Sequence, residues 1–125
     1  MKHIVILKKW ALEKIISLDK TIESRWSINK TTPYKKLKIG DLLYLKETGK
    51  EVTHTAVVKD VKYYELSDEI IKELLSLYGK DIGVDQSYYL KIRNKKYGTL
   101  IWLGEIKKIE PFKVKKSYGS GWLVI

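Results

Sequence analysis

Three charged side chains and one indole fall within seven residues of the sequence, at Lys20, Glu23, Arg25 and Trp26. In an extended strand Glu23 and Arg25 lie on the same face, because successive side chains point to opposite sides. Lys20 precedes this strand at a turn, where the alternation does not apply, so it can lean over the same face. Two opposite charges are costly inside an apolar core. We therefore expect this face at solvent or along a pocket.

These residues leave three interpretations open. In the first, Glu23 and Arg25 form an ion pair on a solvated strand, as most charged residues are solvated. In the second, Lys20 and Arg25 bind an anion in a cleft and Glu23 orients one of them. In the third, Lys20 and Glu23 are a catalytic pair, in which Lys20 acts as nucleophile or base and Glu23 handles protons.

The order of these residues resembles the ASCH domain (activating signal cointegrator homology), a branch of the PUA-like RNA-binding superfamily. That family carries a Gly-x-Lys-x-x-Glu-x-Arg motif after its first helix. Lys20, Glu23 and Arg25 match the motif, and Leu18 takes the place of its Gly. The Leu-Lys-Ile-Gly-Asp-Leu run at residues 37–42 resembles the Leu-Lys-x-Gly-Asp turn of the family. Three later segments look similar as well, at residues 56–61, 68–78 and 100–112.

The resemblance implies an α+β fold, a PUA-like/ASCH small β-barrel of five to six strands with two to three peripheral helices, over one domain spanning residues 1–125. It also implies a cleft lined by the motif and an RNA or nucleotide ligand. Some members resemble enzymes. One bacterial branch is an amidohydrolase that acts on N4-acetylcytidine through a Lys and a Thr of this motif and a later Glu, and other members are linked to RNA cleavage. Lys20 matches that Lys, but Glu23 occupies the position of the Thr, so the nucleophile of the amidohydrolase is missing.

The charge of the chain is strongly positive and unevenly distributed. The 125 residues carry a net charge of +10. Residues 1–62 contribute +7, residues 63–90 contribute −4 and residues 91–125 contribute +7. Basic surfaces attract phosphates from a distance. The distribution therefore favours nucleic-acid or nucleotide binding over solubility charge on a Lys-rich protein.

Candidate contacts to nucleic acid come from three places in the sequence. The motif contributes cations and an indole, the aperiodic segment 27–36 and its continuation contribute clustered Lys beside Tyr34, and a basic cluster precedes Gly98. A plain solvated loop is the alternative for segment 27–36. The predicted contacts are Lys20, Arg25, Trp26, Lys35, Lys36, Lys38, Lys95 and Lys96.

Several classes of site are disfavoured by composition. The chain has no Cys, which removes disulfides and Cys-based zinc sites. The two His, His3 and His54, are too few and too far apart to indicate a metal site. No phosphate-binding loop or dinucleotide fingerprint is present, so no cofactor is expected. No apolar run reaches the length of a membrane span, and a cytoplasmic protein without a membrane partner is expected. The oligomeric state is not defined by the sequence.

The apolar periodicity predicts short strands interrupted by two or three helices. Ser67 is a suitable N-cap and Gly79 a suitable residue just past the end of the helix at 68–78. A bulge is expected near residues 59–60, where the alternation of a long strand breaks. Trp102 is expected in the core of a central strand. The predicted strands cover residues 3–7, the motif segment, 42–46, 51–64, 99–109 and 122–125, the helices cover 10–18, 68–78 and 85–94, and turns lie at 47–50 and 119–121.

Three functions remain open from these patterns. The leading hypothesis is an RNA- or nucleotide-binding module built around the Lys-x-x-Glu-x-Arg motif. A small hydrolase acting on modified nucleosides or RNA is the alternative, and turnover assays separate the two. A protein-interaction adaptor, docking through the acidic helix at 68–78, is the third.

Overall fold

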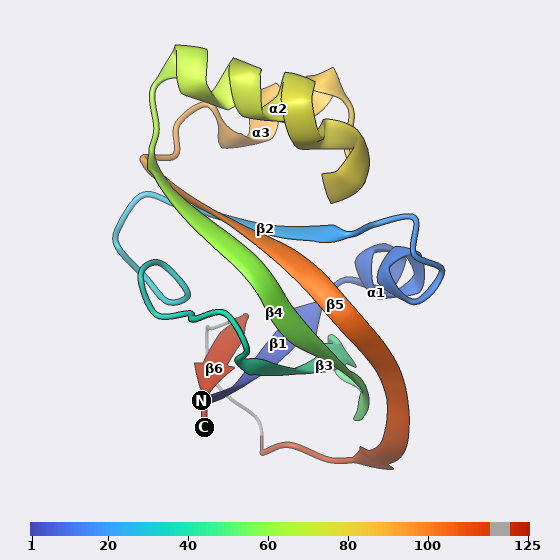
Figure 1. Ribbon diagram of the computed structural model, residues 1–125. Helices are drawn as coiled ribbons and strands as arrows, with labels where there is room; N and C mark the ends of the chain where they lie inside the picture. The colour runs from blue at the N-terminus through green and yellow to red at the C-terminus, as the bar shows by residue number, and fades with distance from the viewer. Residues whose placement is uncertain (116–120) are drawn as a thin grey trace.

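The computed structural model describes residues 1–115 and 121–125. Within these residues six strands form one mixed sheet in the order β2-β5-β4-β3-β1-β6, accompanied by three α-helices and one 3₁₀ turn (Figure 1). The predicted α+β small barrel of five to six strands with two to three helices is therefore confirmed. The elements are β1 Lys2–Leu7, α1 Lys9–Ile16, β2 Ile22–Ser27, β3 Leu42–Glu47, β4 Val52–Glu65, α2 Asp68–Ile82, η1 Gln86–Tyr88, α3 Tyr89–Ile92, β5 Tyr97–Phe112 and β6 Trp122–Val124.

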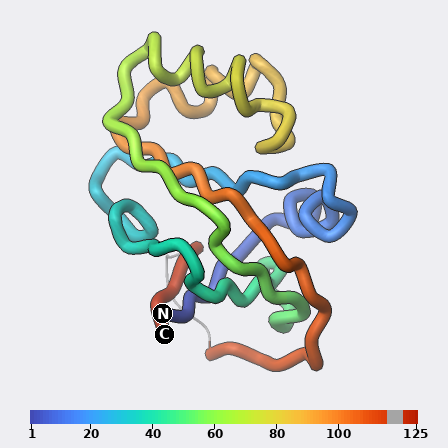
Figure 2. Tube along the Cα trace, in the orientation of Figure 1, coloured from blue at the N-terminus to red at the C-terminus, as the bar shows by residue number. Residues whose placement is uncertain are grey.

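Two long antiparallel strands, β4 and β5, run side by side through the whole molecule (Figure 2). Their pairing shifts register at three points, including the step between Val58 and Asp60. Each such irregularity bends the strand and increases its twist. The bulge expected near residues 59–60 is thus confirmed. The bends curl the sheet into a half-barrel (Figure 1). This curvature brings the two edge strands, β2 and β6, toward each other.

The apolar core lies on both sides of this sheet. Inside the curl, Leu43, Val58 and Ile101 are fully buried and pack with Leu12 and Ile15 of α1. On the other side, α2 and α3 cover β2 and β5, as the outer helices in Figure 1 show. The prediction that the helix beginning at residue 68 packs outside the barrel is confirmed. The residues under these helices are Ile22, Ile71, Leu74, Leu75, Ile82, Ile92 and Leu100.

Helix α2 is four residues longer than its predicted end at Tyr78. It continues through Gly79 to Ile82 and ends at Gly83, which takes the left-handed conformation with φ +89°. The apolar stripe explains the extension, because Ile82 lies one turn beyond Tyr78 and is 1% exposed. The start at Ser67 is as predicted, since its hydroxyl accepts the backbone N–H of Ile70 at 3.2 Å.

Other boundaries differ from the predictions by a few residues. Helix α1 ends at Ile16, and Leu18 then takes a left-handed φ of +66°. The turn that the ASCH motif makes with Gly is therefore made here by Leu18 at the same position. The segment predicted as a second short helix splits into η1 and α3. Asp85 is the N-cap of η1, and its side chain accepts the backbone N–H of Ser87. Residues 119 and 120 of the predicted turn lie outside the described residues.

The segment between β2 and β3 is anchored to the sheet through its aromatic residue. Tyr34 is 6% exposed, and its ring centroid lies 5.5 Å from that of Tyr63 and 5.0 Å from that of Tyr97. The Tyr63 hydroxyl also bonds both the N–H and the carbonyl of Leu37 at 2.9 Å. Burial inside this aromatic cluster removes the Tyr34 ring from the surface, so only the lysines of this segment remain available to a nucleic acid. Trp102, predicted in the core, is only partly buried: it packs edge-to-face on Tyr78 at 5.4 Å at the margin of the core under α2.

Candidate functional site

Glu23 is the centre of a buried cluster of charges on edge strand β2. Pairing with β5 places Glu23 opposite Ile101, and the side chain is 6% exposed. Its Oε1 contacts the Lys20 Nζ at 3.2 Å and accepts the Ser24 N–H at 3.1 Å. Its Oε2 accepts the Arg25 Nε at 2.9 Å and pairs with the Arg25 Nη2 at 2.8 Å. Four N–H donors therefore surround one carboxylate, which has little capacity to accept more.

Lys20 ties this cluster to the end of α2. Its side chain is 2% exposed, and the Nζ donates to the carbonyl oxygens of Ile22 at 2.8 Å and Ile82 at 2.7 Å. With Glu23, these carbonyls provide an acceptor for each of its three N–H bonds. Ile82 ends α2, where unpaired carbonyls carry the negative end of the helix dipole. The ammonium of Lys20 is therefore stabilised by a helix terminus and a carboxylate together.

Arg25 spans the seam between the two edges of the curled sheet. Its Nη2 donates to the carbonyl of Ile6 on β1 at 3.0 Å, and its Nη1 donates to the carbonyl of Gly121, just before β6, at 3.3 Å. The guanidinium also lies 5.3 Å from the ring centroid of Trp122. A side chain at Gly121 would place its Cβ 2.7 Å from the Nη1, so a glycine leaves the room that Arg25 occupies.

The electrostatics of the cluster follow from these contacts. Burial by itself would raise the pKa of Glu23, but the charges of Arg25 and Lys20 and the hydrogen bonds they donate outweigh it and lower the pKa. Glu23 is thus ionised at neutral pH between two cations. The three side chains together carry a net charge of about +1, and that charge is most accessible on Arg25, whose side chain is 24% exposed.

All three motif residues line one cleft with a volume of about 450 Å³. Tyr88 of η1 also lines this cleft. Burial raises the pKa of the Tyr88 phenol, the nearby charge of Glu23 raises it further, and Arg25 opposes this effect. The cleft therefore combines a cation, a neutral phenol and aromatic walls. Such groups can bind a planar polar ligand or a phosphate.

Two further hollows adjoin the cleft. One, of about 230 Å³, lies beside Arg25 and Trp26 and is closed by residues 31–33 and Thr99. The other, of about 620 Å³, lies between α1, the end of α2 and η1. It is lined by Trp10, Lys14, Lys80, Tyr88 and Lys91 among others. The cleft is thus the middle of a longer depression in the surface.

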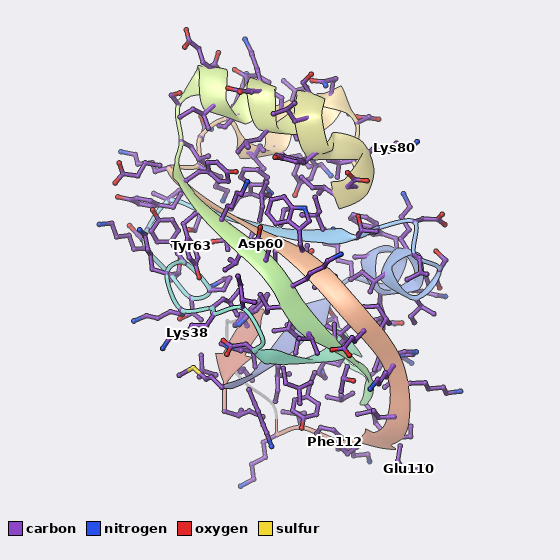
Figure 3. All side chains as sticks on the ribbon, viewed as in Figure 1. Lys38, Asp60, Tyr63, Lys80, Glu110 and Phe112 are labelled. Atoms are coloured by element: carbon purple, nitrogen blue, oxygen red, sulfur yellow. The ribbon has the colours of Figure 1, made fainter. Side chains whose placement is uncertain are left out.

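The structure separates the predicted contact residues into two sets. Lys20, Arg25 and Trp26 line the cleft, although the Trp26 ring is half-buried against α2 and donates its Nε1 to the Ser24 hydroxyl at 3.0 Å. The predicted lysines outside the motif line none of the three hollows described above. Lys38, for example, lies across the molecule from Lys80 (Figure 3). The lysines outside the hollows are Lys35, Lys36, Lys38, Lys95 and Lys96.

Residues that sequence reasoning did not assign to the site come from distant parts of the chain. Tyr88 of η1, Lys91 of α3 and Gly121, just before β6, line the cleft. No local pattern links them to the motif. The continuation of the α2 stripe to Ile82 was the signal that could have placed the end of this helix, and hence the Ile82 carbonyl, beside Lys20.

The described residues hold no cluster of three or more His, Asp or Glu side chains arranged to bind a metal ion. None of the helices in residues 1–115 and 121–125 is both long and apolar enough to cross a membrane.

Comparison with solved structures places this fold among known ones. The ASCH protein from Zymomonas mobilis aligns over 90% of this chain and 73% of its own, with a TM-score of 0.69 and 19% identity. A point mutant of the same protein aligns with the same TM-score over 89% of this chain and 72% of its own, at 19% identity. The hypothetical protein PH0355 aligns over 87% of this chain and 100% of its own, with a TM-score of 0.58 and 19% identity. No model of a protein family and no curated protein sequence matches the chain. The chain thus has the fold of the ASCH protein structures, as its motif suggested.

Proposed function

We propose that this protein is an RNA- or nucleotide-binding ASCH-like module whose ligand occupies the cleft lined by Lys20, Glu23 and Arg25. One observation carries the proposal. Glu23 is satisfied by two cations, so the cleft retains a positive charge on the partly exposed guanidinium of Arg25. Arg25 already directs its Nε, Nη2 and Nη1 at Glu23, Ile6 and Gly121. A phosphate or base edge would therefore bind the remaining N–H of its fork and share the others. The basic segments of the chain supply the long-range attraction for such a ligand.

In this proposal Glu23 positions the two cations of the cleft. It keeps Lys20 and Arg25 in place while the cleft is empty, because a buried cation without a counter-charge is costly. A phosphate or base carbonyl then shares Arg25 with Glu23 when the cleft is filled. Lys20 positions Glu23 and does not contact the ligand directly, since its three N–H donors already have acceptors.

The test of this function is RNA binding by Arg25→Lys. The wild-type protein is expected to bind single-stranded or hairpin RNA with micromolar or weaker affinity that falls steeply as salt rises. Arg25→Lys keeps the charge but loses the planar fork, so we expect about a tenfold loss of affinity. Fluorescence anisotropy at low salt measures both quantities. Arg93→Lys is the matched control, because Arg93 is exposed at the end of α3 and lines none of the three hollows.

Two outcomes of the same titration would count against the proposal. The absence of any association with RNA at low salt would exclude polymer binding and leave a free nucleoside or nucleotide as the ligand. Equal losses in Arg25→Lys and Arg93→Lys would show that RNA does not bind in the cleft.

The double variant Lys35→Ala, Lys36→Ala is expected to weaken binding without changing base preference, since these lysines lie outside the cleft and act through charge.

Hydrolysis of a modified nucleoside or of RNA is the competing function, because Lys20 and Glu23 touch each other at the cleft. Their geometry does not favour it. The Lys20 amine would have to leave three acceptors before it could attack, and the Glu23 carboxylate is surrounded by four donors.

We accordingly expect no deacetylation of N4-acetylcytidine at micromolar protein, measured by chromatography of the nucleoside. Turnover that disappears in both Lys20→Ala and Lys20→Arg, in samples whose circular dichroism shows a folded protein, would identify an enzyme instead. Turnover that survives both changes would come from a contaminant.

A further inference from the structure

The cleft at Arg25 and the larger hollow beside α1 form one continuous groove. They share four lining residues, Trp10, Val84, Tyr88 and Lys91. Their volumes are about 450 Å³ and about 620 Å³. Each falls within the range of a small-ligand site. A ligand that fills the cleft therefore has a second site of comparable size directly next to it. We call the hollow beside α1 the outer pocket.

The outer pocket is positively charged, and its cations have no acidic partner among the described residues, although the Lys14 ammonium lies over the Trp10 ring. Lys14, Lys80 and Lys91 line it, and none of the three forms an ion pair within residues 1–115 and 121–125. Lys80 projects from the last turn of α2 on the side where α1 lies (Figure 3). The one carboxylate of the lining, Asp85, already accepts the N–H and the hydroxyl of Ser87. The outer pocket thus offers unpaired ammonium groups to an anion.

Trp10 stands between the two parts of the groove. Its indole is 41% exposed, although it lines both the cleft and the outer pocket. The ring lies close to Gly83, where an added Cβ would be 3.5 Å from the Trp10 Cζ3. The Nζ atoms of Lys14 and Lys20 lie 5.6 Å and 5.9 Å from the ring centroid. A partly exposed indole in a basic groove is a platform on which a nucleic-acid base can stack once the Lys14 ammonium moves off the ring.

We propose that the outer pocket is a second nucleotide subsite, so that the ligand is a single-stranded RNA segment of at least two nucleotides. The inference rests on the proposed function of the cleft and specifies its ligand. One nucleotide lies against Arg25, and the phosphodiester passes Lys91, which lines both parts. The next base stacks on Trp10, and its phosphate lies near Lys14 and Lys80. A free nucleoside would use the cleft and leave the indole and three lysines without a role.

The experiment compares ligands of increasing length. The nucleoside, the 5′-monophosphate, the dinucleotide and the tetranucleotide of each of the four bases compete with a fluorescent tetranucleotide for the protein. For the preferred base, we expect the dinucleotide to bind at least about tenfold more tightly than the monophosphate, because a second base gains a stacking partner. Trp10→Ala is expected to remove that gain, whereas Trp10→Phe keeps most of it. The readout is the ratio of dinucleotide affinity to monophosphate affinity in each variant, because Trp10 also lines the cleft.

Charge in the outer pocket is tested separately through salt dependence. Lys14→Ala with Lys80→Ala removes two expected phosphate contacts, so the slope of log affinity against log salt for the tetranucleotide should fall by about 1.4. Lys59→Ala with Lys107→Ala is the matched control, because both lysines are exposed on β4 and β5 and line neither part of the groove. This control should change the slope by less than half as much.

The possible results separate the two proposals. A dinucleotide that binds no better than the monophosphate, with both lost in Arg25→Lys, overturns the second subsite and leaves the cleft proposal standing. A length dependence that neither Trp10→Ala nor the Lys14, Lys80 double variant reduces also overturns it, because the second nucleotide then lies elsewhere. Failure of every ligand to bind overturns both proposals.

Discussion

Glu23→Gln is expected to lower the free energy of unfolding by about 3–5 kcal/mol, the largest effect of any change in the cleft. The substitution keeps the size of the side chain and removes its charge. Lys20, 2% exposed, then holds an ammonium in the interior with no carboxylate beside it. The Gln amide also presents donors where the native oxygens accept four N–H groups, which adds unsatisfied polar atoms. Chemical denaturation followed by tryptophan fluorescence measures the loss.

The control for this variant is Glu13→Gln. Glu13 is 64% exposed and pairs with Lys9 at 3.9 Å, on the surface of α1. Exposed pairs of this kind contribute little, so no measurable change is expected. A Glu23→Gln protein as stable as Glu13→Gln would show that the buried charge cluster does not stabilise the fold.

The stability difference between the wild type and Glu23→Gln is also expected to depend on pH. The pKa of Glu23 is lowered in the folded state from its usual value of 4.5. A lowered pKa contributes stability that is present above the unfolded value and is lost as the pH falls below it. The difference in stability between wild type and Glu23→Gln should therefore be constant near neutral pH and shrink below about pH 4.5. A difference that stays constant down to pH 3 would contradict the assignment of the ionised carboxylate.

Lys20→Met is expected to destabilise the protein by about 3 kcal/mol. Methionine fills a similar volume but leaves the carbonyl of Ile82 and one oxygen of Glu23 without the donors that Lys20 provides. Glu23 keeps its pair with Arg25, so the loss should be smaller than in Glu23→Gln. Lys9→Met is the matched control, since Lys9 is 73% exposed. The measurement is again chemical denaturation at neutral pH.

The double variant Lys20→Met, Glu23→Gln tests whether the two residues act on each other. Removing both partners of a buried pair leaves no unpaired charge between them, so the combined loss should fall short of the sum of the single losses. Additive losses would mean that the 3.2 Å contact between Lys20 and Glu23 carries no coupling. The Ile82 carbonyl remains unpaired in the double variant, and we therefore expect a residual loss.

Much of the fold was predictable from periodicity because local rules operate there. Ser67 and the apolar stripe that follows it predicted α2, and the broken alternation near residues 59–60 predicted the bulge that curls β4. The end of α2 was misplaced because a glycine is a frequent but not obligatory stop. At Gly79 the burial of Ile82 outweighs the cost of a glycine within a helix.

The spacing of Lys20, Glu23 and Arg25 was sufficient to indicate a charged face next to a turn, because strand alternation and a preceding helix are properties of the local chain. The conformation of the turn before β2 was not predictable from the local sequence. The family motif has a Gly there, and this chain makes the turn with Leu18 at φ +66°. Its exposed side chain, 65% accessible, gives no sign of the backbone that it adopts.

By itself the sequence determined the periodic elements, the positive charge and the three motif positions on and just before β2, since each depends on residues close together in the chain. The tertiary structure decided what those positions contact. The curl of the sheet brings Gly121 and Ile6 to Arg25, and the packing of α2 brings the Ile82 carbonyl to Lys20. These partners lie 19 to 96 residues away in sequence. Their approach depends on how much apolar surface the whole chain buries, which no local pattern encodes.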